Sequence, residues 1–142
     1  MIKREQIVVA ACADTMFPPN GPIAVSGTEA ELVSYVDAYI RALPRMQRFL
    51  VHMLFLFIQL SPLVFGPRHS RFSRLSQHER LMVFRDMEVS SIYFRRIAFL
   101  SMRAIMTFGY FACKRVDAVI MRQESERVDV TIMRQEEDEV TS

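Results

Sequence analysis

The chain has 142 residues and a formal net charge of +2, with 51% hydrophobic and 24% charged residues. This composition excludes wholesale disorder, because disordered chains combine few apolar residues with a strong net charge. Two Cys, four Gly and six Pro exclude disulfide-dense, collagen-like and low-complexity classes, and the length allows one domain with its own core.

Charge is distributed unevenly along the chain. Residues 1–40 carry 2 basic and 5 acidic side chains, residues 41–115 carry 13 basic and 3 acidic, and residues 116–142 carry 3 basic and 8 acidic. The central block is basic almost entirely through Arg, which pairs with carboxylates and phosphates and stacks on aromatic rings. Such a block can pair with the acidic tail, with an acidic partner or with a polyanion, or it can simply form solvated helix faces.

The N-terminal segment predicts a helix over residues 3–16, because Ile7, Val8, Ala11 and Thr15 lie near one helical face. Three prolines in residues 17–22 end it. The apolar run before Asp14 is short and no twin-Arg pair precedes it, so the N-terminus does not support export. We therefore expect a protein that is cytoplasmic or peripheral to the inner face of the membrane, with Cys12 and Cys113 reduced.

A second helix is expected up to about Leu43. Thr28 and Glu31 have the spacing of a capping box, in which each side chain bonds the other residue's main chain. The apolar stripe that follows consists of Leu32, Val36, Tyr39, Ile40 and Leu43. Pro44 suits the first turn of the next helix.

Residues 45–60 form the most apolar segment, and Gln59, Ser61 and Pro62 are expected to close it. Its run from Phe49 to Leu60 is shorter than the about 20 residues that a membrane-spanning helix needs. We therefore expect a central buried helix rather than a transmembrane one. His52 interrupts the run, and a neutral, hydrogen-bonded histidine is expected there rather than a metal ligand.

A basic loop over residues 66–75 precedes a second capping box at Ser76 and Glu79. Residues 77–89 should then be helical, with Leu81, Phe84 and Val89 partly inward. After a bend at residues 90–91, the pattern predicts a long helix over residues 92–112. Gly109 near its end weakens the last turns or allows another backbone to approach closely.

The acidic tail contains an internal repeat with a period of 12 residues. The segment from Val116 to Glu124 recurs as the segment from Val128 to Glu136. Alternation of Val128, Val130 and Ile132 is compatible with a strand or with a linear segment that docks on a partner. The other interpretation is a local duplication that stays a mobile tail.

Chemical motifs are missing from the sequence: there is no dinucleotide, P-loop, zinc-protease, CxxC or nucleophile-elbow pattern. His52, His69 and His78 do not share a metal-ligand spacing. We therefore expect no catalytic, metal or cofactor-binding residue in this chain. Asp14 is expected to act as a structural cap or as a group that faces a partner. The loop residues Arg68, His69, Arg71 and Arg74 fit phosphate, or more often carboxylates of the same fold or of a neighbouring subunit.

Four short segments occur in an order that resembles a known family. They are Ala10-Ala11-Cys12-Ala13-Asp14-Thr15-Met16-Phe17-Pro18, then Val36-Asp37-Ala38-Tyr39-Ile40 with Leu43-Pro44, then Arg71-Phe72-Ser73-Arg74-Leu75-Ser76 with Glu79-Arg80, and finally Phe108-Gly109-Tyr110-Phe111 with Val116. The family is the gluconate 2-dehydrogenase subunit 3 (small-subunit) type, together with the related helical domain of long-chain alcohol oxidases. The resemblance covers about residues 7–120.

The resemblance implies an all-helical, non-catalytic accessory subunit of an oxidoreductase complex. Its partner would be a large glucose–methanol–choline (GMC) type flavoprotein that holds FAD and oxidises an alcohol or a sugar. The expected fold is all-α: one compact domain of about five or six helices over residues 1–115, followed by the acidic tail 116–142. Residues expected to bind the partner are arginines and aromatics, which are enriched at interfaces: Arg68, Arg71, Phe72, Arg74, Arg95, Arg96, Tyr110 and Phe111.

An alternative function is a peripheral membrane-surface protein. Residues 49–65 and 92–112 are apolar, and the arginines around them can meet anionic lipid headgroups. Nucleic-acid binding is not expected, because the arginines are interspersed with core-type residues and no helix-turn-helix, RNA-binding or zinc pattern is present.

Overall fold

The computed structural model describes residues 1–66 and 69–141, and within them the chain forms six α-helices, one short 3-10 helix and no strand. The elements in chain order are α1 (Lys3–Met16), α2 (Leu32–Ala42), α3 (Arg45–Phe65), η1 (Phe72–Arg74), α4 (Gln77–Glu88), α5 (Tyr93–Phe111) and α6 (Lys114–Thr141). The predicted all-α fold class is confirmed.

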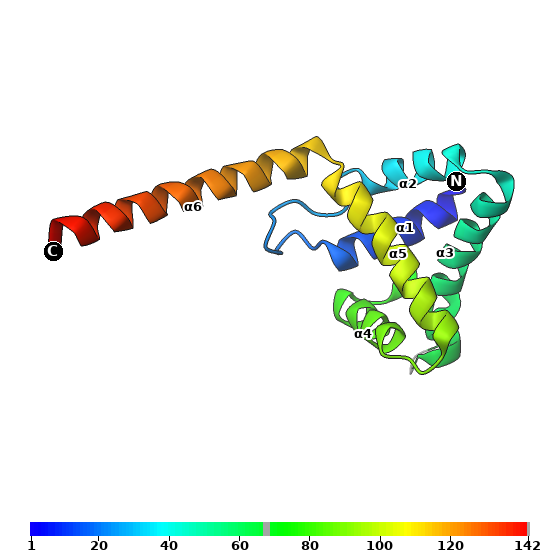
Figure 1. Cartoon of the computed structure of the whole chain (residues 1–142). Coiled ribbons are helices and arrows are strands. Elements are labelled where there is room, and N and C mark those ends of the chain that lie inside the picture. Colours follow the sequence, from blue (N-terminus) through cyan, green and yellow to red (C-terminus); the bar gives the residue numbers. More distant parts are fainter. Residues whose placement is uncertain (67–68, 142) are drawn as a thin grey trace.

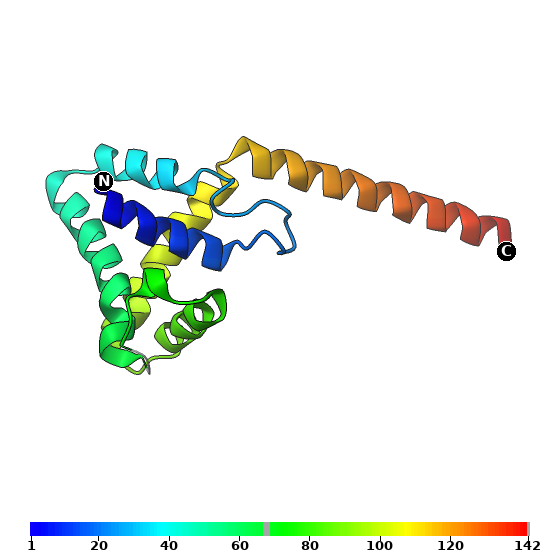
Figure 2. The ribbon, with the colours of Figure 1, turned by 180° about the vertical axis from the view of Figure 1, so that it is seen from behind.

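The first five helices form one body, and α6 projects away from it (Figures 1 and 2). α1 packs against α2, α3, α4 and η1, while α5 crosses α2, α3 and α4. Their inward faces make a single apolar core in which Val9, Cys12, Val36, Met102 and Met106 are almost fully buried. Burial of these faces is the main stabilising contribution to the body.

The capping box predicted before α4 is confirmed. The main-chain N–H of Glu79 donates to Ser76 Oγ at 3.3 Å, and the Ser76 N–H donates to Glu79 Oε2 at 2.9 Å. The inward face of α4 differs from the prediction: Phe84 is buried as expected, but Leu81 and Val89 are exposed. Val83 and Met87, which lie on the same helical face as Phe84, are buried in their place.

The capping box predicted at Thr28 is wrong, because the reciprocal pair is Ser26 with Glu29. The Ser26 N–H donates to Glu29 Oε2 at 2.9 Å, and the Glu29 N–H donates to Ser26 Oγ at 3.2 Å. Thr28 instead donates its N–H at 3.1 Å and its hydroxyl to Asp14 Oδ1. Asp14 therefore links the end of α1 to the turn before α2. This agrees with its predicted role as a structural cap.

The prediction that the apolar helix ends near residue 60 and is buried all round is wrong. α3 continues to Phe65 with Pro62 inside its last turn. Its only fully buried residues are Phe55, Ile58, Ser61 and Pro62, which lie on the side that meets α1 and α5. The opposite side has no neighbour within the described residues, so the helix is buried along one stripe.

The tail is helical, not a strand and not an extended segment. α6 runs over Lys114–Thr141, and Val116 is its one buried residue. Val119 and Ile120 pack partly against the body, and every residue from 121 to 141 is exposed. Residues with strong helix propensity, chiefly Glu, Arg, Gln and Met, are frequent in this segment, and the described residues contain no strand that could pair with it.

Candidate functional site

α5 exposes an apolar stripe along its whole length. Residues of α5 that are buried, such as Met102 and Met106, face the core. On the opposite side, at helical spacing, the exposed residues are Tyr93, Ile97, Leu100, Ala104, Phe108 and Phe111. Phe108 is 71% exposed and Leu100 is 54% exposed, which is unusual for a row of large apolar side chains in a soluble domain.

α3 carries a second apolar stripe of the same kind. Its exposed members recur every three or four residues and are Met46, Phe49, Met53, Leu56, Leu60 and Val64. Among the described helices, α3 alone has the length and apolar composition to cross a membrane. Polar contacts nevertheless anchor it in the body: His52 Nδ1 lies 2.7 Å from Glu5 Oε1 in α1, and the Gln59 amide group donates to Ser73 Oγ at 2.8 Å.

Phe57 of α3 and Phe94 of α5 join the two stripes. Their rings meet edge to face, with centroids 5.1 Å apart. We refer to the two stripes together as the outer face. The whole chain exposes 9936 Å² of accessible surface. A compact monomer of this mass is expected to expose about 7,500 Å². Both the outer face and the projecting α6 contribute to this excess.

Two exposed arginines of α5, Arg96 and Arg103, lie on the helix that carries the first stripe. Arg96 stacks over the ring of Tyr93 at 5.9 Å, and Arg103 lies 3.4 Å from Glu88. Within the described part of the chain, no carboxylate pairs with Arg71, Arg74 or Arg96. These three guanidinium groups can donate hydrogen bonds to a carboxylate from outside the body.

The structure divides the residues predicted to bind a partner into two groups. Arg71, Arg74, Arg96 and Phe111 are exposed and can contact another molecule. Phe72, Arg95 and Tyr110 are buried, so their prediction as surface contacts is corrected. Phe72 stacks on Phe84 at 5.1 Å, and Tyr110 stacks on Phe17 at 3.8 Å. Arg68 lies outside the described residues.

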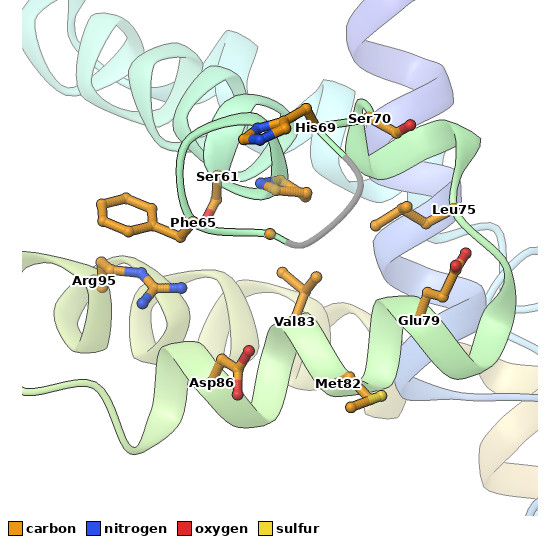
Figure 3. Close-up of a pocket in the computed structure, with 12 residues that line it drawn as sticks. Ser61, Phe65, His69, Ser70, Leu75, Glu79, Met82, Val83, Asp86 and Arg95 are labelled. Atoms are coloured by element: carbon orange, nitrogen blue, oxygen red, sulfur yellow. The ribbon is translucent and has the colours of Figure 1, made fainter.

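A cavity of about 340 Å³ lies between the C-terminal end of α3, α4 and the start of α5 (Figure 3). Its wall is mostly apolar and includes Phe65, Leu75, Met82 and Val83. The polar groups on it come from Ser61, His69, Ser70, Glu79, Asp86 and Arg95. Two of these polar groups, the Ser61 hydroxyl and the Arg95 Nε–H, are buried with no hydrogen-bond partner among the residues that the structure describes. No pattern in the sequence indicated that Ser61 and Arg95, which are 34 positions apart, line one cavity.

The groups whose pKa values are shifted lie outside this cavity, and their roles are structural. Burial raises the pKa of the Cys12 thiol well above its ordinary value. The N-terminal ammonium group of Met1 donates to Asp37 Oδ1 at 2.9 Å and lowers the pKa of that carboxyl, with a further contribution from Arg41. Among residues 1–66 and 69–141, no three His, Cys, Asp or Glu side chains gather as metal ligands would.

Comparison of the chain with protein-family models, with curated proteins and with solved structures gives no match.

Proposed function

We propose that this chain is a non-catalytic accessory subunit that packs its outer face on a larger flavoprotein oxidoreductase of the glucose–methanol–choline type. FAD and the site of alcohol or sugar oxidation would belong to that partner. The observation that carries the proposal is the outer face itself, two rows of large apolar side chains that the body leaves exposed. The class of partner comes from the resemblance of four sequence segments to the gluconate 2-dehydrogenase small-subunit family.

The energetics of the outer face favour a protein partner. Full burial of one Leu, Phe or Met side chain contributes about 1.5–3 kcal/mol. A stable protein interface buries about 800 Å² on each side, an area that two helix stripes can supply. Met46 and Met53 add flexible side chains that adapt to an uneven surface. Arg71, Arg74 and Arg96 would then pair with carboxylates at the rim of the interface.

Stabilisation of the partner follows from mass action, because a subunit that binds only the folded flavoprotein shifts its folding equilibrium. The test is to express the flavoprotein from the same cells with and without this chain, and to measure soluble yield and bound flavin. We expect both to fall when the chain is left out. Equal yield and equal flavin content would overturn the proposal.

Two variants link that effect to the outer face. Leu56→Glu and Leu100→Glu each place a charge in the middle of one stripe and should abolish co-purification with the flavoprotein. Val130→Glu introduces the same charge at an exposed position of α6, and co-purification should persist. Circular dichroism of each variant establishes that its helices are retained.

A peripheral membrane protein is the second candidate, and the apolar length of α3 favours it. In that function the outer face would lie in the lipid interface, while Arg45 and Arg96 meet anionic headgroups. Flotation of the purified chain with vesicles that contain phosphatidylserine decides this at low salt. Binding that Leu100→Glu removes would support the function, and no flotation would exclude it.

A further inference from the structure

The cavity between α3, α4 and α5 is a built site that the accessory role does not use. Arg95 is 9% exposed and Ser61 is 2% exposed, so both are more than nine-tenths buried. Figure 3 shows the guanidinium group of Arg95 extending from α5 into the space between α3 and α4, toward which Ser61 points from α3. Each of the two side chains has one buried polar atom that no described residue hydrogen-bonds.

The charge of Arg95 is the central observation. Its one hydrogen bond to a described residue goes to Ser90 Oγ at 3.3 Å, and its guanidinium carbon lies 4.3 Å from the centre of the Phe65 ring. No carboxylate of the described residues is within ion-pairing distance of it. A buried charge without a counter-ion is costly, and a buried donor without an acceptor adds to the cost. An anion in the cavity would remove both costs.

The other residues that line the cavity indicate that the ligand also has an apolar part. Phe65, Leu75, Met82 and Val83 surround the space with apolar atoms, and Asp86 and His69, which also line it, are exposed residues. Since a water molecule occupies about 30 Å³ in the liquid, 340 Å³ corresponds to roughly ten groups of that size. This volume is at the lower end for small-molecule sites and suits one short chain or one ring.

We propose that this cavity binds a small amphipathic carboxylate. Its two oxygens would accept hydrogen bonds from the Nε edge of Arg95 and from the Ser61 hydroxyl, and its chain of roughly eight carbons would lie against Val83 and Met82. The carboxylate of Asp86 would repel a second negative charge near it, so the site selects monoanions over dianions.

The experiment uses the full chain and three probes of equal chain length: octanoate, octanol and octylammonium. Titration calorimetry and thermal unfolding report binding. We expect octanoate to bind and to raise Tm, and we expect octanol to bind at least about tenfold more weakly because it cannot neutralise Arg95. Octylammonium should not bind. Equal binding of octanoate and octanol would overturn the proposal.

Variants separate the cavity from the outer face, which also offers apolar surface. Val83→Phe fills the cavity and should abolish octanoate binding. Arg95→Met removes the charge, keeps an apolar stem and should weaken octanoate at least about tenfold. Arg96→Met changes the neighbouring, exposed arginine and should leave affinity unchanged. Octanoate that binds Val83→Phe as tightly as the wild type would place binding elsewhere and overturn the proposal.

Ser61→Ala keeps the test decisive if circular dichroism shows that Arg95→Met does not fold. This substitution removes one oxygen atom and should weaken octanoate severalfold while octanol loses less. Unchanged affinity in Ser61→Ala, together with retained binding in Val83→Phe, would refute the site without any use of Arg95→Met. Because Val83 and Ser61 lie in the cavity wall, these variants should leave co-purification with the flavoprotein intact, so the two proposals fail independently.

Discussion

The hydroxyl group of Tyr110 donates a hydrogen bond to the main-chain carbonyl of Val25 at 2.7 Å, across 85 positions of sequence. The same ring stacks on Phe17 with 3.8 Å between centroids. Phe17 and Val25 belong to the proline-rich connection between α1 and α2, which has no regular structure of its own. The end of α5 therefore holds that connection in place, and with it the start of α2.

Tyr110→Phe tests this relationship. The substitution keeps the ring and its stacking but leaves the buried carbonyl of Val25 without its partner, which costs about 1–3 kcal/mol. We expect the urea midpoint to fall with an unchanged m value. Tyr93→Phe makes the same chemical change at a residue that is 69% exposed and should change stability by less than about 0.5 kcal/mol. Equal effects of the two substitutions would contradict the role of this bond.

Alkaline pH should destabilise the protein through Cys12 and Tyr110. Burial raises the pKa of both groups above the ordinary values of 9.0 and 10.0. Above pH 9 the unfolded chain therefore releases protons that the folded chain still holds, and the free energy of unfolding decreases as pH rises. Urea titrations should give constant stability from pH 7 to about 8.5 and a progressive loss above it. A flat profile up to pH 11 would contradict the burial of both groups.

Thiol reagents should distinguish the two cysteines. Cys12 is fully buried, whereas Cys113 is only partly buried. In the native protein, Ellman's reagent should modify Cys113 and leave Cys12 intact, because reaction needs an accessible thiolate. The variants Cys12→Ala and Cys113→Ala assign each rate to one residue. Modification of Cys12 should begin only when urea unfolds the body, and rapid native modification of Cys12 would argue against this packing.

Replacement of Gly27 or Gly109 by alanine should lower the free energy of unfolding by different amounts. A Cβ atom at Gly27 would lie 2.5 Å from the main-chain carbonyl carbon of Ala13, and the backbone cannot move aside. At Gly109 the Cβ atom would meet side-chain atoms of Tyr35 and Leu32, the latter at 2.7 Å. Gly27→Ala should therefore cost at least about 2 kcal/mol in urea unfolding. Gly109→Ala should cost about 1 kcal/mol, because alanine's helix propensity offsets part of the clash. The reverse order would contradict these contacts.

Local signals in the sequence were sufficient to predict boundaries of three helices. Prolines end α1, the Ser76 capping box begins α4, and the bend at residues 90–91 begins α5, so these boundaries match within one or two residues. The reciprocal pair in the turn before α2 could not be settled locally, because Ser26 and Thr28 both have a Glu three positions later. A long-range contact decides between them, since Asp14 recruits Thr28.

The site was less predictable than the fold for the same reason. The all-round apolarity of α3 does not say which stripe the body covers, and that depends on where α1 and α5 pack. Arginines and aromatics were expected at the surface, yet Arg95, Phe72 and Tyr110 lie on the inward faces of their elements. The cavity needs Ser61 and Arg95 from two helices, and no spacing in the sequence brings them together.

α6 should be energetically independent of the body beyond its first two turns. Val116 is buried, and Val119 and Ile120 are partly buried. Farther along the helix, the Gln123 side-chain amide donates to the Pro22 carbonyl at 3.3 Å. A chain that ends at Ile120 should therefore unfold within about 0.5 kcal/mol of the full chain. A chain that ends at Cys113 also loses Val116 and should be destabilised by about 1–3 kcal/mol.

Amide hydrogens of residues 124–141 should exchange quickly, because a helix without tertiary packing opens readily in water. Strong protection of these amides, or a large loss of stability on ending the chain at Ile120, would mean that the helix packs along its length.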